Sequence, residues 1–215
     1  MAITAKDDIK VRIIRHPERQ DWERCKDLAL RTIGKKWTGS EVTEAWKRDM
    51  LKCRHSPIRT LMFTIEMEIP YFVSTHFVRH KYGVEHFVQS QRNDRQSSYD
   101  RDLAPQSAMV MHTMDINAEA VMNMSHRRLC TLADITTRYV MTKICQEILK
   151  VNPEFEEQLV PMCEHLHECP EFAASSCGRY EKYARQPGTF IYSPRPEDDD
   201  VKAIPVCESD LCSHY

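Results

Sequence analysis

The residues best suited to chemistry in this sequence are cations that follow an apolar segment. His76 and the triplet Arg79, His80 and Lys81 come first, and the run Ser90-Gln91-Arg92 comes later. Guanidinium forks, hydroxyls and backbone N–H groups are the donors that bind phosphates and other anions. These residue types in this order therefore predict an anion-binding pocket.

The segment before these cations predicts the scaffold that positions them. Residues 60–69 alternate between polar and apolar side chains, which is typical of a half-buried strand. The apolar face of this strand consists of Leu61, Phe63, Ile65, Met67 and Ile69. Pro70 can then begin a helix over 71–79, which would bring the cations to its C-terminal end, where the helix dipole favours positive charge.

Further elements are expected along the chain. A strand over 9–15 precedes a helix that Pro17 begins and Gly34 ends. Thr38 and Glu41 have the spacing of a capping box, which predicts that a second helix begins there. The remaining predicted elements are an extended segment at 84–91, a strand at 108–113, a helix from Asp115 or Asn117 to about Cys130, and a helix over 132–151.

A second basic pair, Arg127 and Arg128, lies on the predicted helix that ends near Cys130. Adjacent side chains on a helix diverge by about 100°. At most one of the two is therefore expected to face a given ligand.

Length and composition indicate the class of protein. A chain of 215 residues with 41% hydrophobic content can form one good core. We expect a single domain over residues 1–185. The prolines and the acidic run Glu197–Asp200 predict an extended tail over 186–215.

Net charge and motif content restrict the classes of partner and of enzyme that are expected. The 30 Lys and Arg residues nearly balance 32 Asp and Glu residues, so duplex nucleic acid is not an expected partner and phosphate binding must be local. Glycine-rich phosphate loops are absent, which argues against Rossmann and P-loop enzymes. No run is long enough to span a membrane and the N-terminus lacks the apolar segment of a signal peptide, so we expect a cytoplasmic protein without a membrane partner.

The nine cysteines are scattered, which is typical of reduced thiols in a reducing compartment. One group stands apart: Cys163, His165, His167, Cys169 and Cys177. Zinc ligands usually occur in pairs two to four residues apart, and the intervals between these cysteines do not fit that pattern well. No metal ligand is assigned, and metal binding by this group is left open.

Four motifs together resemble the flavin-dependent thymidylate synthases, the ThyX family. The family signature is Arg-His-Arg-x7-Ser, and this chain has Arg79-His80-Lys81-x8-Ser90. The other matches are Ser56-Pro57 before the long strand, Arg101-Asp-Leu-Ala-Pro105 for the family's Arg-x-x-Leu-Pro, and Asn117-Ala118 with Asn123 and Arg128 at the family's intervals. The similarity extends roughly from Arg54 to Glu157.

The resemblance implies an α+β fold peculiar to the family, with an antiparallel sheet and long helices. It also implies a homotetramer with shared active sites. The implied reaction is transfer of a one-carbon unit from methylenetetrahydrofolate to C5 of a pyrimidine deoxynucleotide monophosphate, dUMP to dTMP, with FAD as cofactor and NADPH as co-substrate.

Site residues follow from the resemblance position by position. The flavin would be bound by Ser56, Arg79, His80, Lys81, Asn117, Glu119 and Asn123. The nucleotide would be bound by His76, Arg79, Ser90, Gln91, Arg92, Arg101 and Arg128. Arg128 would also act as the catalytic residue that polarises the pyrimidine ring. An interaction with the ring that is stronger in the transition state than in the ground state accelerates the reaction.

The sequence also departs from the family pattern. Lys81 replaces an arginine, and one extra residue precedes Ser90. Arg54 and Arg59 stand where the family has His and Glu, and Glu119 stands where it favours Arg. Val88 replaces a glutamate, and only residues 93–100 remain of a longer helical connection.

These departures leave two alternatives open. One is an enzyme of the same fold that hydroxymethylates dUMP or acts on dCMP. The other is a non-catalytic ThyX-derived protein in which the segment 163–177 binds zinc or nucleic acid.

Overall fold

The computed structural model describes residues 8–95, 100–172, 176–177 and 180. The extended tail expected over 186–215 lies outside the described residues. No helix in the described part of the chain is both long and apolar enough to cross a membrane.

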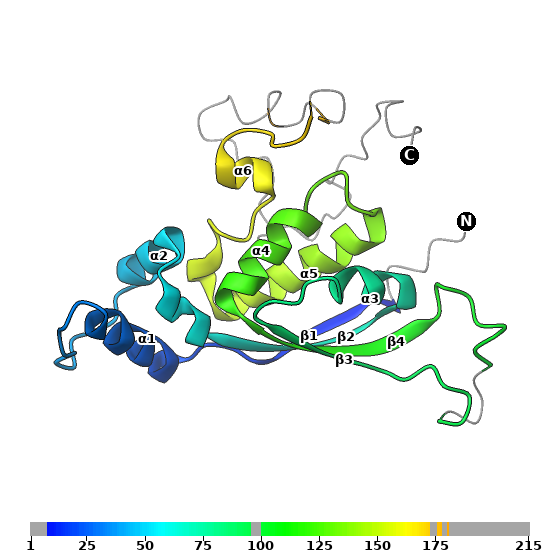
Figure 1. Ribbon diagram of the computed structural model, residues 1–215, viewed down its shortest axis with the longest axis horizontal. Coiled ribbons are helices and arrows are strands. Elements are labelled where there is room, and N and C mark those ends of the chain that lie inside the picture. Colours follow the sequence, from blue (N-terminus) through cyan, green and yellow to red (C-terminus); the bar gives the residue numbers. More distant parts are fainter. Residues whose placement is uncertain (1–7, 96–99, 173–175, 178–179, 181–215) are drawn as a thin grey trace.

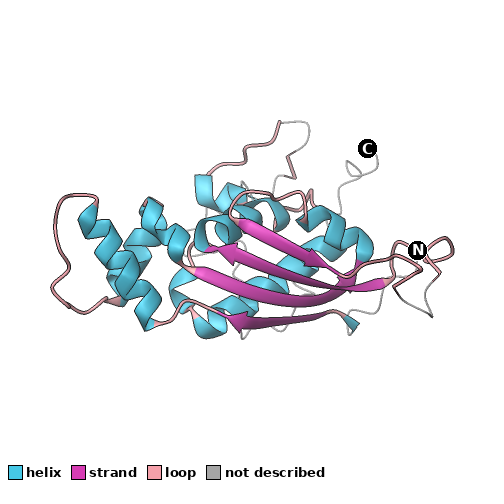
Figure 2. Ribbon diagram, turned by 60° about the horizontal axis from the view of Figure 1, so that its bottom comes forward, coloured by secondary structure: helices cyan, strands magenta, loops and turns pink. Residues whose placement is uncertain are grey.

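A four-stranded antiparallel sheet forms the base of the molecule (Figure 1). Its strands are β1 (Lys10–Arg15), β2 (Met62–Pro70), β3 (Val84–Val88) and β4 (Met109–Asn117), in the order β1-β2-β4-β3. The helices α3, α4 and α5 lie on one face of the sheet, and α1 and α2 lie at one end of it (Figures 1 and 2).

The helical elements complete the fold. They are α1 (Arg19–Arg31), α2 (Glu44–Cys53), η2 (Ser56–Thr60), α3 (Tyr71–Phe77), α4 (Ala118–Arg128), α5 (Ile135–Val151), η3 (Pro153–Phe155) and α6 (Met162–Leu166). The mixed helix and antiparallel-sheet architecture confirms the predicted α+β class.

Alternation along β2 and β4 builds the core. The side chains of Phe63, Ile65 and Met67 are buried on the helix-covered face, as the sequence pattern predicts. β4 follows the same period of two, so Met114 and Ile116 are buried beside them. These facing strands form the centre of the hydrophobic core.

The end of α1 also agrees with the sequence. Gly34 has φ +71°, a left-handed conformation that glycine adopts without steric cost. Its N–H donates to the Arg31 carbonyl over 3.0 Å, and the Lys35 N–H donates to the Leu30 carbonyl over 3.0 Å. This pair of bonds is a Schellman motif, which satisfies carbonyls that the helix end would leave unpaired.

Three predicted boundaries were wrong. α2 begins at Glu44, and its N-cap is Thr43, whose hydroxyl accepts from the Trp46 N–H, so the spacing of Thr38 and Glu41 does not start a helix. α3 ends at Phe77, which leaves the triplet 79–81 in the following turn. β4 continues to Asn117, because pairing with β2 along its whole length extends it beyond the weak local signal at 108–113.

The start of the long helix was also misplaced. α5 begins at Ile135 with Asp134 as its N-cap. Leu132 and Ile135, at the start of the predicted helix, are exposed, whereas Ile144 and Ile148 further along it are buried. The N-cap Asp134 therefore starts α5 three residues later than the predicted start at residue 132.

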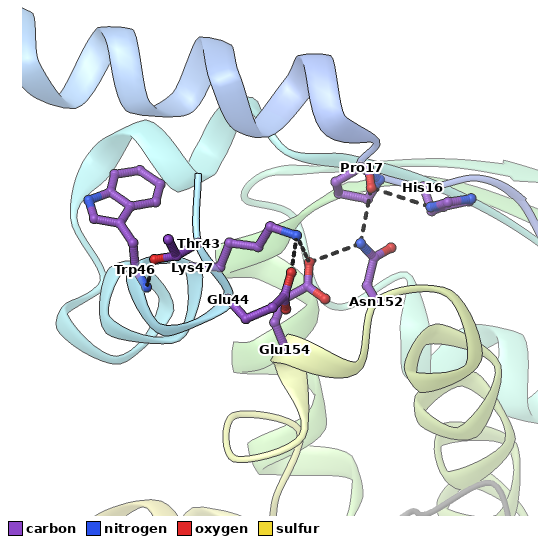
Figure 3. A network of polar contacts seen from close by, with 8 residues as sticks. All are labelled: His16, Pro17, Thr43, Glu44, Trp46, Lys47, Asn152 and Glu154. Atoms are coloured by element: carbon purple, nitrogen blue, oxygen red, sulfur yellow. Dashed lines mark hydrogen bonds and ion pairs between the residues drawn. The ribbon is translucent and has the colours of Figure 1, made fainter. Parts of the chain in front are cut away.

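A buried polar network joins the N-terminal helices to the end of α5 (Figure 3). The Asn152 amide donates to the Pro17 carbonyl over 3.0 Å and to the Glu154 carboxylate over 3.1 Å. The Lys47 ammonium lies 3.9 Å from the same carboxylate. Pairing of this kind compensates the cost of burying the charge of Glu154, which is 3% exposed.

Candidate functional site

The centre of the candidate site is a contact between the ends of two helices. Arg128 occupies the last turn of α4, and His80 lies in the turn after α3. The Arg128 Nε–H donates to Nε2 of His80 over 3.0 Å, and Nη2 donates to the His76 carbonyl oxygen. The tertiary fold therefore brings together three of the predicted site residues from two distant segments.

His80 is neutral in this arrangement. Burial and then the neighbouring Arg128 charge lower the pKa of His80 to about 4. Because Nε2 accepts the hydrogen bond from Arg128, the ring proton of the neutral form lies on Nδ1. His80 thus orients the guanidinium group without adding charge to the site.

His76 supports the same corner of the site. Its Nδ1 lies 2.7 Å from the Thr137 hydroxyl at the start of α5. Burial and then the Arg128 charge lower the pKa of His76. The ring is therefore held against α5 while its backbone carbonyl binds Arg128.

Positive charge around this corner has no carboxylate partner among the residues that the structure describes. Arg79, Lys81 and Arg127 are exposed near the half-buried Arg128. Within the described residues, every ion pair with a carboxylate involves other cations. Burial and then Arg79 lower the pKa of Arg128. A half-buried guanidinium with no carboxylate partner is a strong attractor for an anionic ligand.

A cavity of ≈ 310 Å³ adjoins this pair. His80 and the end of α4, with His126, Arg127 and Arg128, form one part of its wall. The α4–α5 connection and a few described residues between Pro161 and Tyr180 form the rest. Thr131 also lines it, and its buried hydroxyl has no hydrogen-bond partner among the described residues. A volume of this order is at the small end of the range for ligand pockets.

The predicted flavin residues of α4 already have partners. Asn117 caps the helix by accepting from the Ala120 N–H over 2.9 Å, and its own N–H donates to the Gly83 carbonyl over 2.9 Å. Asn123 accepts from Arg54 over 2.7 Å. The turn after residues 79–81 therefore lies beside the start of α4, as the prediction requires. The side-chain amides of Asn117 and Asn123, however, are both hydrogen-bonded within the protein.

Two departures from the family pattern face each other. The Arg59 Nε donates to the Glu119 carboxylate over 2.5 Å. Both positions depart from the family pattern that the sequence resembles, and in this chain their opposite charges form an ion pair. Ser56, the remaining predicted flavin residue, is exposed at the start of η2 in the same region.

The remaining predicted nucleotide residues are not brought to the His80–Arg128 pair. Ser90, Gln91, Arg92 and Arg101 all lie in the connection between β3 and β4. Val84 of β3 pairs with Ile116 and Val88 pairs with His112, so this connection leaves the end of β3 opposite to His80. Arg92 forms a bidentate pair with Asp94, at 2.9 and 2.7 Å. Within one chain the predicted nucleotide residues therefore form two groups.

The sequence did not reveal a pair of histidines, His86 and His112, that lies next to His80. The His86 Nε2 lies 2.9 Å from the His80 carbonyl, so it must donate, and its Nδ1 lies 2.9 Å from Nε2 of His112. His112 is fully buried, and its Nδ1 has no hydrogen-bond partner within the part of the chain that the structure describes. The only sequence signal was that both residues lie in strand-like segments, which says nothing of their pairing.

A second missed group surrounds His126 of α4, which lines the same cavity as His80 and Arg128. The ring of His126 stacks on His165 with centroids 4.4 Å apart, and the Arg54 Nη2 lies 3.3 Å from the His126 ring nitrogens. Burial and then Arg54 lower the pKa of His126 to about 3. His165, which the sequence groups with nearby cysteines, is thus engaged by a neutral histidine.

Comparison with known proteins supports the fold. No family model matches the sequence, and no curated protein matches it. Among solved structures, the chain is similar to a UMP/dUMP methylase, PolB, from Streptomyces cacaoi, bound with 5-Br dUMP, with a TM-score of 0.52. The two share 16% sequence identity over 68% of this chain and 92% of that chain. At this identity the likeness establishes that this chain has the fold of that methylase.

Proposed function

We propose that this chain is an enzyme that transfers a one-carbon unit from methylenetetrahydrofolate to C5 of a pyrimidine deoxynucleotide monophosphate, with FAD as cofactor and NADPH as reductant. The observation that carries the proposal is the half-buried Arg128, which is held by neutral His80 and has no carboxylate partner in the described part of the chain. The shared fold adds support, because the protein of similar structure is a UMP/dUMP methylase bound with 5-Br dUMP.

Arg128 is suited to activating a pyrimidine ring. Its bonds to His80 and to the His76 carbonyl fix the plane of the guanidinium group, and other N–H groups stay available to a ligand. When C5 of a pyrimidine acts as a nucleophile, charge develops on the ring, and a fixed donor stabilises that charge without reorganising. The reaction then requires no protein nucleophile.

The cysteine chemistry is consistent with this assignment. Cys130 and Cys163 line the cavity, and burial raises the pKa of both thiols. A thiol with a raised pKa is a poor nucleophile at neutral pH. Arg128, in contrast, lines the cavity as a fixed charge donor.

The residues around the triplet fit the anionic part of a flavin. Arg79, Lys81 and Arg127 are exposed cations without carboxylate partners in the described residues, so they can bind its phosphates. To bind the ring system as well, Asn117 and Asn123 would have to contact it while keeping their hydrogen bonds to the Ala120 N–H and to Arg54. When bound, the flavin supplies the reducing equivalents that convert the transferred carbon to a methyl group.

Flavin retention tests the cofactor. Purified protein should be yellow, and the double substitution Arg79→Ala with His80→Ala should abolish flavin retention while the circular dichroism of the helices is kept. The matched control is Lys10→Ala with Arg12→Ala, which removes two cations of β1 that pair with glutamates outside the site. Unchanged flavin occupancy in the Arg79 and His80 double variant would remove the flavin from the proposal.

Single turnover tests the reaction. The protein is mixed with methylenetetrahydrofolate, reductant and either dUMP or dCMP, and the products are separated by mass. A methylated dUMP supports the proposed reaction, whereas a hydroxymethylated product or preferred use of dCMP supports the alternative enzyme. A colourless protein that converts neither nucleotide supports the non-catalytic alternative.

A further inference from the structure

A second, larger cavity lies between the N-terminal helices and the end of α5. Its volume is ≈ 840 Å³, and no residue lines both this cavity and the one beside Arg128. The start of α1, the start of α2 and residues 151–154 form most of its wall. A volume of this order lies within the range of about 300–1,000 Å³ for small-molecule sites. Three buried side chains with polar atoms line it: Trp22, Asn152 and Glu154.

The wall of this cavity carries an excess of negative charge. Five glutamates line it, against one arginine and one lysine. Arg19 pairs with Glu23 over 2.8 Å, and Lys47 pairs with Glu44 over 2.6 Å. Both cations are therefore neutralised by glutamates of the same wall. The remaining carboxylates favour a ligand of positive charge.

Glu154 is the most deeply buried of these carboxylates, with 3% of the residue exposed. Among the described residues it accepts one hydrogen bond, from the Asn152 amide over 3.1 Å. The Lys47 ammonium lies 3.9 Å away and makes its shorter contact with Glu44, and Figure 3 shows it beside both carboxylates. A buried carboxylate can accept several hydrogen bonds, so Glu154 has capacity for further donors.

Two of the buried side chains that line the cavity each keep one polar atom without a partner in the described part of the chain. Asn152 is 4% exposed, and its Nδ2 donates to the Pro17 carbonyl and to Glu154. Its Oδ1 points away from both partners (Figure 3) and accepts no hydrogen bond. Trp22 is 1% exposed, and its Nε1–H has no acceptor. Buried polar groups are nearly always hydrogen-bonded, so these atoms indicate a bound molecule with both a donor and an acceptor.

We propose that this cavity binds a small organic cation, an ammonium or guanidinium compound that also carries an oxygen acceptor. Its N–H groups donate to Glu154 and to Oδ1 of Asn152, and its oxygen accepts from the Trp22 Nε1–H. A metal ion fits less well, because the described residues contain no group of three or more His, Cys, Asp or Glu side chains placed to hold one. This site is separate from the one proposed for one-carbon transfer.

Calorimetric titration of the full chain with argininamide tests the site, because this probe joins guanidinium and ammonium groups to a carbonyl oxygen. One equivalent should bind, whereas glutarate, an anion, should not. Glu154→Gln should weaken argininamide binding by about tenfold or more, the scale of losing a charge-assisted hydrogen bond. Glu68→Gln is the matched control, because Glu68 pairs with Lys10 on the sheet and does not line the cavity, and it should bind as the wild type does.

Glu41→Gln keeps the proposal testable if Glu154→Gln does not fold. Glu41 is an exposed residue of the cavity wall, so its loss should weaken binding by about twofold to fivefold, the scale of an exposed ion pair. Bound argininamide should also raise the melting temperature of the wild type.

Several results would overturn the site: no saturable binding at millimolar argininamide, equal binding of glutarate, unchanged affinity in the folded variants of Glu154 and Glu41, or an equal loss in Glu68→Gln. None of these measurements involves flavin or turnover. An inactive protein that binds argininamide would therefore contradict only the proposed function.

Discussion

Arg128 Nε donates a 3.0 Å hydrogen bond to Nε2 of His80, whose pKa is lowered to about 4. The guanidinium is therefore paired with a neutral acceptor, and its charge is kept for a ligand. Arg127, the adjacent cation, is exposed and lines the same cavity, but it makes no hydrogen bond with His80. Comparing the two residues therefore separates the preorganised guanidinium from a nearby exposed charge.

Arg128→Ala should lower turnover by roughly 10² or more, the scale of losing one preorganised charge donor, while flavin binding is largely kept. Arg128→Lys should rescue poorly, because a compact ammonium cannot reproduce the planar fork that reaches His80, the His76 carbonyl and a ligand from fixed directions. Steady-state kinetics of each variant gives the measurement. Equal turnover of Arg127→Ala and Arg128→Ala would show that Arg128 does not polarise the substrate.

Arg92 and Arg128 should act in one site that is shared between subunits. They lie at opposite ends of β3 within one chain, so we expect a homotetramer in which a second copy supplies the 89–108 connection. Arg92→Ala and Arg128→Ala, each inactive alone, should regain activity when co-expressed, because some sites then receive both intact residues. No recovery in verified mixed oligomers, or an active monomer by light scattering, would contradict a shared site.

Gly83→Ala should destabilise the protein more than Gly39→Ala. Both glycines have positive φ, +73° and +83°, so each substitution carries the left-handed cost of about 1–2 kcal/mol. Only at Gly83 would the added Cβ meet another group, 2.4 Å from the Asn117 amide that caps α4. Disturbing that cap adds about 1 kcal/mol. Urea denaturation compares the two variants, and equal losses would show that the contact with Asn117 relaxes freely.

Acid should destabilise the folded chain between about pH 6.5 and pH 4. Burial, with help from nearby cations or histidines, lowers the pKa of His80 and His112 to about 4 and that of His126 to about 3. In this range the unfolded chain binds protons that the folded chain does not, so the free energy of unfolding falls as the pH falls. Denaturation midpoints at pH 7.5 and 5 measure the effect.

His126→Gln isolates one part of that acid sensitivity. Glutamine cannot titrate, so the loss of stability between pH 7.5 and 5 should be smaller in this variant than in the wild type. An equal loss in both proteins would mean that His126 is protonated in the folded state or that carboxylates dominate.

Local pattern in the sequence was enough to predict several elements. The alternation of Phe63, Ile65 and Met67 indicated β2 and its buried face, because strand geometry alternates side chains whatever surrounds it. Asn117 was one of two expected N-caps, and the structure selects it. Gly34 ends α1 as expected, since its role depends on one backbone conformation.

Where several residues could begin the same helix or strand, the sequence did not show which one does. Thr38, Ser40 and Thr43 all precede the second helix, and only Thr43 caps it. The length of β4 depends on its partner β2, which no local window contains. Such boundaries depend on pairing and packing in the folded chain.

The chemistry of the candidate site shows the same division. The sequence alone determined that the chain carries an unusual run of cations around Arg79 and a second basic pair at Arg128. Only the tertiary structure decided that His80 contacts Arg128 and that Arg59 contacts Glu119. It also decided that Cys130 lines the same cavity as cysteines more than thirty residues away in the sequence. Contacts of this kind depend on how helices and strands pack, and no short-range periodicity carries that information.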